Sequence, residues 1–327
     1  MLFGKNREIN PNSEHRDWLL VSSLAQNVLQ EQKKTRRWGI FFKLLTFLYL
    51  SLALFAVALG GRQMNGVNIP KSHAALVKVN GVIAAEQPSN ANTVIKGLRL
   101  AFASELSEAV ILSINSPGGS PVQAGYIYDE ILALREKYPS KKLYAVISEL
   151  GASGGYYIAA AADEIYADKA SLVGSIGVTA SGFGYVDALD KLGVERRHFA
   201  AGEHKTFLDP FSPLKEDEVT FWQSVLESTH EQFIRVVKQG RGDRLVESDQ
   251  LFSGLLWNGE QALGLGLIDG LGSASYVANK IIGVEGVYDY TPRQSPLEEI
   301  TRKFGVAIGS GITQALGVSE NRFQFSY

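Results

Sequence analysis

Residues 142–162, KLYAVISELGASGGYYIAAAA, place a predicted strand, a glycine-rich turn and an alanine-rich helix in direct succession. The strand covers 142–148, where β-branched and aromatic residues are concentrated, and the helix covers 154–162. The same order occurs upstream, where an apolar strand at 109–115 leads through a second glycine-rich turn to a helical pattern at 122–138. Strands that alternate with helices predict an α/β domain with a largely parallel, buried sheet.

Three more segments fit this alternation. Strands are expected at 75–83 and 164–167, and a long helix at 213–239 has an apolar side. The residues on that side are Phe221, Val225, Phe233 and Val237. We therefore expect one α/β domain over residues 75–290, followed by an irregular C-terminal tail over 291–327.

The composition excludes several classes of protein. With 45% hydrophobic residues among 327, the chain has enough apolar material for a folded core. The 32 Lys and Arg residues balance 34 Asp and Glu residues, which gives no electrostatic basis for binding nucleic acid. The absence of cysteine excludes disulfides, thiolate metal sites and a cysteine nucleophile.

Residues 39–59, GIFFKLLTFLYLSLALFAVAL, form a 21-residue apolar run with a single charge, Lys43. A helix of that length spans about 30 Å, the thickness of the hydrocarbon core of a bilayer. Because the run has no polar stripe, we expect it to cross a membrane. Ala56-Val57-Ala58 resembles a cleavage site, so a signal peptide is the alternative. The 38 residues before the run exceed the short basic start of a leader, which favours an uncleaved signal anchor.

Basic residues predict the orientation of this anchor. Four of them stand just before the apolar run, and Arg62 stands just after it. The four are Lys33, Lys34, Arg36 and Arg37. The positive-inside rule then places residues 1–38 in the cytoplasm and the residues after about 60 outside it.

The segments on either side of the anchor differ in character. Residues 14–34 carry apolar side chains at helical spacing, which indicates either an amphipathic helix or a weakly ordered tail. These side chains are Trp18, Val21, Leu24, Ala25 and Val28. Residues 60–74, rich in Gly, Asn, Pro and Ser, are typical of a linker.

The two glycine-rich turns are the first place to look for chemistry, because α/β sheets bind ligands beyond the carboxyl ends of their strands. One turn is Ser116-Pro117-Gly118-Gly119-Ser120, and the other contains Ser153 at the start of the alanine-rich helix. The free N–H groups at a helix start stabilise negative charge, which suits a nucleophile beside an oxyanion hole. The structural alternative is that Ser153 only caps the helix.

Four ordered motifs resemble the signature blocks of the signal peptide peptidase A (protease IV) family of membrane-anchored serine proteases. They are Asn115-Ser116-Pro117-Gly118-Gly119, GASGGYY at 151–157, VGSIGV at 173–178 and GLGLIDGLG at 264–272. The resemblance covers roughly residues 75–285 and implies a Clp/crotonase-like α/β fold. The single-domain length is similar to that of the compact members.

The resemblance also implies site residues. The family uses a Ser/Lys dyad, which falls here on Ser153 and on Lys205, 52 positions later. The oxyanion hole would use the N–H groups of Gly154 and of Gly118 or Gly119. Ser175 could hydrogen-bond the lysine or have only a structural role at the end of its strand. No metal or other cofactor is implied.

A lysine acts as a base only when it is neutral, which requires burial among apolar side chains. Phe199, Phe207 and Phe211 are close in sequence to the dyad lysine and could supply that burial. The alternative base is a histidine, as in the Ser-His-Asp site of the Clp proteases. His198 or His204 would then be oriented by an aspartate, and the candidates are Asp187, Asp190 and Asp209.

Family resemblance implies a serine endopeptidase of the bacterial inner membrane, with its catalytic domain on the periplasmic side. Its substrates would be remnant signal peptides and other small membrane or misfolded polypeptides. Compact members assemble into rings, so a homo-oligomer is expected. Two alternatives are an envelope protease with one dedicated membrane-protein substrate and a non-catalytic binding module on a crotonase-like scaffold.

Overall fold

The computed structural model describes residues 11–63, 72–246, 248–292 and 325–326. The chain divides into two compact units, Met1–Ile69 and Pro70–Tyr327.

The first unit contains one continuous helix, α1 (Pro11–Gln63). Its segment Gln30–Phe55 is long and apolar enough to cross a membrane, with a mean hydropathy of 1.8, and its side chains are exposed. The helix continues through Gly60 and Gly61, so the linker begins later than the sequence indicates. Glycine weakens a helix by about 1 kcal/mol without stopping it. The side chains of Val21, Leu24, Ala25 and Val28 lie outside the described residues.

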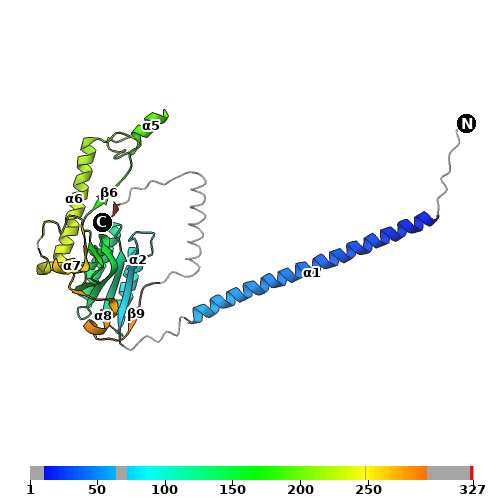
Figure 1. Cartoon of the computed structure of the whole chain (residues 1–327), viewed down its shortest axis with the longest axis horizontal. Helices are drawn as coiled ribbons and strands as arrows, with labels where there is room; N and C mark the ends of the chain where they lie inside the picture. The colour runs from blue at the N-terminus through cyan, green and yellow to red at the C-terminus, as the bar shows by residue number, and fades with distance from the viewer. Residues whose placement is uncertain (1–10, 64–71, 247, 293–324, 327) are drawn as a thin grey trace. The chain divides into compact units, whose positions relative to one another are not determined.

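The second unit is built on a mixed sheet whose main path runs β7-β5-β3-β2-β1-β9 (Figure 1). In chain order, these strands are β1 (His73–Asn80), β2 (Ser107–Ser116), β3 (Leu143–Ala152), β5 (Leu172–Gly174), β7 (Leu256–Asn258) and β9 (Val287–Asp289). Off this path, β4 (Glu164–Ala167) pairs with β3 and with β8 (Gly270–Leu271). Every pairing in this sheet is parallel except that of β5 with β7. The expected α/β architecture with a largely parallel sheet is confirmed.

Helices cover both faces of the sheet. One face packs against α2 (Ala91–Ala103), α3 (Pro121–Lys137), α4 (Gly154–Ala159) and α6 (Glu216–Arg241). The other face packs against α8 (Ala274–Tyr276) and the π-helical turn η3 (Val277–Ile282). Alternate residues of β2 therefore enter different cores: Leu112 and Ile114 the first, Ile111 the second.

The remaining elements lie toward the chain's C-terminal half. They are β6 (Thr179–Ala180), α5 (Val186–Leu192), the 3₁₀ turn η2 (Gly242–Arg244), α7 (Gly259–Gly264) and β10 (Phe325–Ser326). β6 and β10 form a separate antiparallel pair. Figure 1 shows α5 and the N-terminal end of α6 reaching beyond the sheet.

The predicted elements differ from the observed ones mainly at their ends. The strand at 164–167 is β4, and the long helix starts and ends within three residues of the expected bounds. The alanine-rich helix stops at Ala159 instead of 162, because Ala161 and Ala162 donate to carbonyls only three residues back, in a tightened last turn. Of the expected irregular tail at 291–327, residues 293–324 and 327 lie outside the described part.

A buried ion pair joins the end of α6 to the segment before β8. The guanidinium of Arg241, 1% exposed, donates to both carboxylate oxygens of Asp269 at 2.8 and 2.9 Å. The Ile165 N–H donates to the same carboxylate at 2.7 Å. Burial alone would raise the pKa of Asp269, but these hydrogen bonds and the nearby guanidinium charges lower it below its ordinary value.

We predict that Arg241→Leu lowers the free energy of unfolding by about 3–5 kcal/mol, because it leaves the Asp269 carboxylate buried without its main partner. Urea unfolding of the full chain in detergent, followed by circular dichroism, measures the change. The control is Arg235→Leu on the same helix, whose ion pair with Glu231 is exposed and should matter little. Equal midpoints for the two variants would contradict this role of the pair.

Candidate active site

The pairing of three strands brings the sequence motifs together. Ser116 at the end of β2 pairs with Gly151 of β3, and Ala152 pairs with Gly174 of β5. The turns that follow these three strands therefore adjoin at one edge of the sheet. Ser153 lies in the middle turn, where its N–H donates to the Gly174 carbonyl at 2.8 Å.

Ser153 has a strained backbone. Its φ of 55° and ψ of −123° lie outside the regions that side-chain-bearing residues normally occupy. Such a conformation costs about 1–3 kcal/mol and is typical of functional sites. Ser153 occupies the N-cap position of α4, but its side chain makes no capping hydrogen bond, so capping does not account for a serine here.

The Ser153 hydroxyl is buried and unpartnered. The residue is 2% exposed, and Oγ has no hydrogen-bond partner among the described residues. A buried polar atom without a partner costs about 1–3 kcal/mol. A hydroxyl held at this cost on a strained turn is typical of a functional site.

Gly118 and Gly119 line the space beside this hydroxyl. A Cβ on Gly118 would lie 2.7 Å from the Gly154 nitrogen and 3.0 Å from Ser153 Oγ. The Gly118 N–H donates to Ser116 Oγ at 3.1 Å. The N–H groups of Gly119 and Gly154 make no hydrogen bond to any other described residue. Since a Cβ on Gly154 would lie 3.4 Å from the Gly119 nitrogen, these two groups are neighbours.

Ser175 follows Gly174 on the other side of Ser153. It also has a left-handed backbone, with φ of 52°, and its N–H donates to the Leu255 carbonyl at 2.8 Å. Its side chain is partly exposed and makes no hydrogen bond within the described chain. Besides Ser153 and Ser175, Leu208 is the other described non-glycine residue with positive φ, and it lies in the segment that carries Lys205.

Trp257 of β7 packs against this edge from outside. A Cβ on Gly174 would lie in tight contact with the Trp257 ring, at 3.1 Å, and the φ of 105° at this position also favours glycine. The buried indole N–H of Trp257 and the hydroxyl of Ser153 are the two unpartnered buried side-chain groups of the described chain. Sequence reasoning missed Trp257, because its place depends on the pairing of two three-residue strands.

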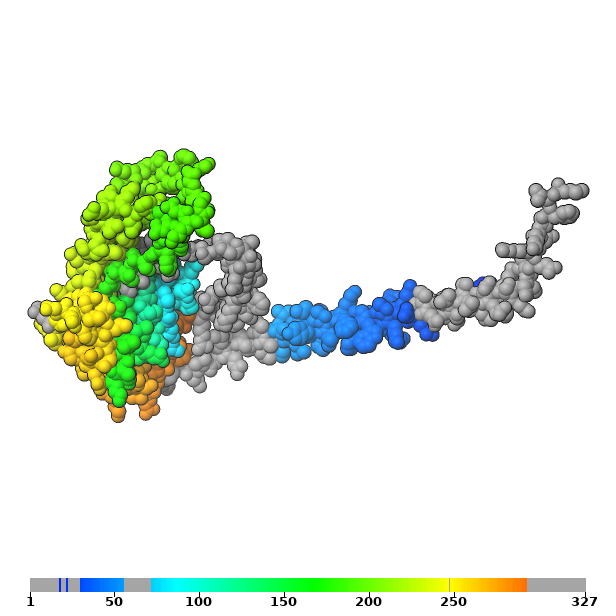
Figure 2. Space-filling view, turned by 45° about the horizontal axis from the view of Figure 1, so that its top comes forward, coloured from blue at the N-terminus to red at the C-terminus, as the bar shows by residue number. Residues whose placement is uncertain are grey.

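Lys205 lies in a series of turns between α5 and α6 and is exposed. The phenylalanines expected to bury it lie elsewhere: Phe199 is 93% exposed, Phe207 packs on Phe221 and Trp222, and Phe211 stacks on Tyr185. Their closeness in sequence therefore does not bury the lysine in the single chain. Figure 2 shows the green and yellow-green surface of this region projecting from the body of the second unit.

The histidine alternative has no geometric support in the described chain. His198 and His204 are exposed, and neither donates to or accepts from Ser153. Asp209 instead pairs with Arg196 and accepts from Ser212 at 2.9 Å. Among the described residues its carboxylate makes no hydrogen bond or ion pair with either imidazole.

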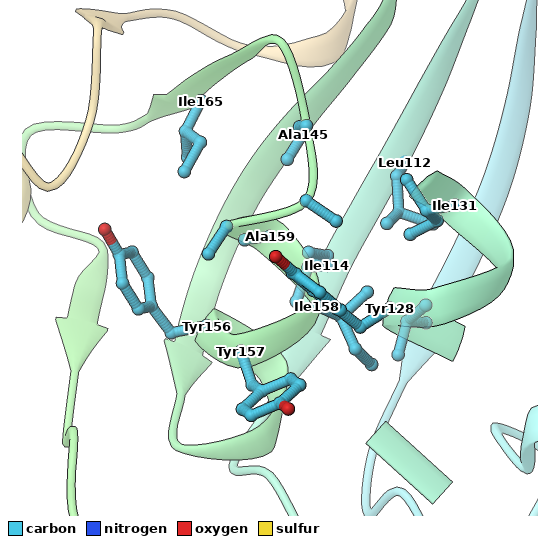
Figure 3. Close-up of a cluster of buried hydrophobic side chains, with 14 of the residues drawn as sticks. Leu112, Ile114, Tyr128, Ile131, Ala145, Tyr156, Tyr157, Ile158, Ala159 and Ile165 are labelled. Carbon is cyan, nitrogen blue, oxygen red and sulfur yellow. The ribbon is translucent and has the colours of Figure 1, made fainter. Parts of the chain in front are cut away.

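The helix that follows Ser153 is anchored deep in the core. Figure 3 shows the side chains of Tyr156 and Tyr157 leaving α4 in different directions. The Tyr156 hydroxyl donates to the Leu267 carbonyl at 2.7 Å, and Tyr157 packs between Tyr128 and Phe233. Burial raises the pKa of Tyr156 and, with the charge of Asp129, raises that of Tyr157 to about 12. Both phenols therefore stay neutral near pH 7, and their role is to hold α4 in place.

Comparison with known proteins identifies related chains. Residues 135–285 match Peptidase family S49. A Na(+)/H(+) antiporter NhaA of Brucella abortus is 46% identical over 186 residues, which are 57% of this chain and 25% of that protein. The chain thus spans a quarter of the length of that relative.

Two further relatives are named as candidate proteases. A candidate signal peptide peptidase SppA of Enterococcus faecium is 33% identical over 215 residues, 62% of this chain and 61% of that protein. A candidate protease of Synechocystis sp. is 32% identical over 199 residues, 61% of this chain and 69% of that protein. Together with the ordered motifs around Ser153, these matches place the chain in peptidase family S49, the family of the SppA and protease 4 peptidases.

Proposed function

We propose that this peptidase is a membrane-anchored serine endopeptidase with Ser153 as nucleophile and Lys205 as general base. The observation that carries the proposal is the Ser153 hydroxyl, buried without a partner on a strained turn beside two free backbone N–H groups. A binding module would have no need for this costly arrangement.

In the proposed reaction, Ser153 Oγ attacks the carbonyl carbon of the scissile peptide bond while neutral Lys205 takes its proton. The N–H groups of Gly119 and Gly154 stabilise the negative oxygen of the tetrahedral intermediate. Lys205 then gives the proton to the leaving amine, and an acyl-enzyme remains. Lys205 then takes a proton from water, the resulting hydroxide attacks the ester carbonyl, and Lys205 returns the proton to Ser153 Oγ as the acyl group leaves. The resemblance implies no metal or cofactor for these steps.

A lysine that acts as a base must be shielded from water, and Lys205 is exposed in the single chain, so the proposed base needs a covering surface. Residues 183–221, which include Lys205, also expose large apolar side chains. They are Phe183, Leu192, Val194, Phe199, Leu214 and Phe221. We infer that a neighbouring copy of the chain covers this segment and that Lys205 reaches the Ser153 of that copy. This contact would make the active enzyme a homo-oligomeric ring.

The strand edge next to Ser153 is suited to binding an extended polypeptide. β6 pairs antiparallel with β10, Phe325 opposite Ala180, which supports binding of an extended segment by strand addition. The substrates would be remnant signal peptides and other small membrane or misfolded polypeptides, in agreement with the name of the Enterococcus relative. A single dedicated membrane-protein substrate is the second candidate.

The basic residues before the apolar part of α1 support a cytoplasmic N-terminus and a periplasmic catalytic domain. We predict that protease added to intact spheroplasts digests an epitope attached after residue 327 and spares one attached before residue 1. The opposite pattern would reverse the orientation, and survival of both epitopes would contradict a periplasmic domain.

A serine-reactive fluorophosphonate probe tests the nucleophile. We expect it to label wild-type protein at Ser153 and to leave Ser153→Ala unlabelled. Gly118→Ala should lower the labelling rate by about a hundredfold, because the new methyl group occupies the space between Ser153 Oγ and the Gly154 N–H.

The matched control is Gly125→Ala, since a Cβ at Gly125 meets nothing within 4 Å. It should label like the wild type, and circular dichroism checks that both alanine variants are folded. Labelling at another serine, or a folded Gly118→Ala protein that labels at the normal rate, would refute this description of the site.

Co-production of two inactive variants tests the origin of the base. Ser153→Ala and Lys205→Ala should each be inactive alone. Produced together in equal amounts, they should show about a quarter of the wild-type peptidase activity, because one site in four pairs an intact serine with an intact lysine of a neighbour.

Lys205→Arg should be inactive, since a guanidinium does not release its proton in this pH range. His198→Gln and His204→Gln serve as controls and should stay active. Inactivity of the co-produced pair would place the lysine and serine of a site in one chain. An active Lys205→Arg protein beside a dead, folded histidine variant would replace the dyad with a triad.

A further inference from the structure

The segment Ser175–Val178 connects β5 to β6 beside Ser153. At one end, the Gly174 carbonyl accepts from the Ser153 N–H, and at the other end β6 pairs with β10. A peptide laid along β6 toward Ser153 would pass this segment. Its position therefore decides where the bond to be cut meets the hydroxyl.

The side chains of Ser175–Val178 are anchored, because Ile176 is buried in the core and Val178 packs against it, but few backbone hydrogen bonds hold the segment. The Ser175 N–H donates to Leu255, and a Cβ on Gly177 would lie 3.2 Å from the Cα of Gly254. The backbone N–H and C=O groups of Gly177 and Val178 make no hydrogen bond to another described residue. These groups are available to an added strand, but no sheet ladder fixes them.

His230 adds a side-chain hydrogen bond to the backbone of this segment. Its Nε2 lies 3.1 Å from the carbonyl oxygen of Ile176, a fully buried residue. A carbonyl only accepts, so His230 must carry its proton on Nε2 and donate it. The imidazole is partly buried and extends from the middle of α6.

Helix α6 contacts the other parts of the site through different residues. Near its start, the Glu218 carboxylate accepts from the Leu208 N–H at 3.3 Å, in the Lys205 segment. One turn after His230, Phe233 packs on Tyr157 of α4, with ring centroids 5.2 Å apart. A change at His230 therefore affects Ser175–Val178 without removing either of these contacts.

We propose that His230 is a positioning residue that fixes Ser175–Val178 as the backbone edge for the substrate. It governs the affinity for an extended peptide and leaves the reactivity of Ser153 unchanged. The inference rests on the proposed function, since it takes the substrate to be a polypeptide bound by strand addition.

The experiment uses the full chain in detergent with three substitutions. His230→Leu removes the donor, His230→Gln keeps an N–H donor near the Nε2 position, and Thr229→Val is the control. Thr229 is a partly buried neighbour whose hydroxyl donates only to Val225 within α6. Each variant is assayed for cleavage of an apolar peptide and for labelling by a small fluorophosphonate. In a Ser153→Ala background, it is also assayed for binding of the same fluorescent peptide.

We expect His230→Leu to raise KM and weaken peptide binding about five- to tenfold, the loss of one hydrogen bond. Its kcat should stay within about twofold, and probe labelling should keep the wild-type rate. His230→Gln should recover most of the affinity, and Thr229→Val should behave as wild type. Unchanged KM and binding in His230→Leu would overturn the proposal, as would labelling that falls in parallel with affinity or a failure of His230→Gln to restore binding.

If the proposed peptidase function is wrong, the same experiment gives a different result. Wild-type protein that neither cleaves the peptide nor labels at Ser153 would refute the peptidase mechanism. Peptide binding in the Ser153→Ala background would still report on His230 in that case. Equal binding by the His230 variants would then refute the positioning role separately.

Discussion

The hydrogen bond from the Ser153 N–H to the Gly174 carbonyl holds the candidate site together. It ties the end of β3 to the end of β5 and keeps Ser153 in its left-handed conformation. The strain is offset by the burial of the next turn of chain, where Tyr156 and Ile158 are fully buried. Burying side chains of this size stabilises a fold by about 1.5–3 kcal/mol each. The packing of α4 therefore maintains a serine conformation that an isolated turn would not adopt.

Local pattern was sufficient to predict the central strands. β2 and β3 have near-continuous apolar runs because the sheet is covered on both faces. The short strands β7, β8 and β9 could not be predicted, since two or three residues become a strand only through their neighbours. Helix α2 was not predicted, although its sequence carries a helical pattern. Val94, Leu98, Ala101 and Phe102 recur at helical spacing after the capping residue Asn90.

The candidate site, like the fold, was only partly predictable from the sequence. Ser153 and Gly118 stand in turns that directly follow strands, so their closeness follows from the order of the sheet. The surroundings of Lys205 do not follow from local sequence, because the phenylalanines near it pack on Trp222 and Tyr185 or face outward. His230 had no local signal at all. It is one polar residue on an amphipathic helix, and its partner Ile176 lies 54 positions away.

Because the indole of Trp257 packs against Gly174, its fluorescence reports on the surroundings of Ser153. The chain has four tryptophans, and the other three are Trp18 and Trp38 of α1 and Trp222 near the start of α6. Indole emission shifts in wavelength and intensity when the local polarity changes. In a chain with the other three replaced by phenylalanine, ultraviolet fluorescence would follow events beside Ser153 in real time, with no dye attached and no substrate modified.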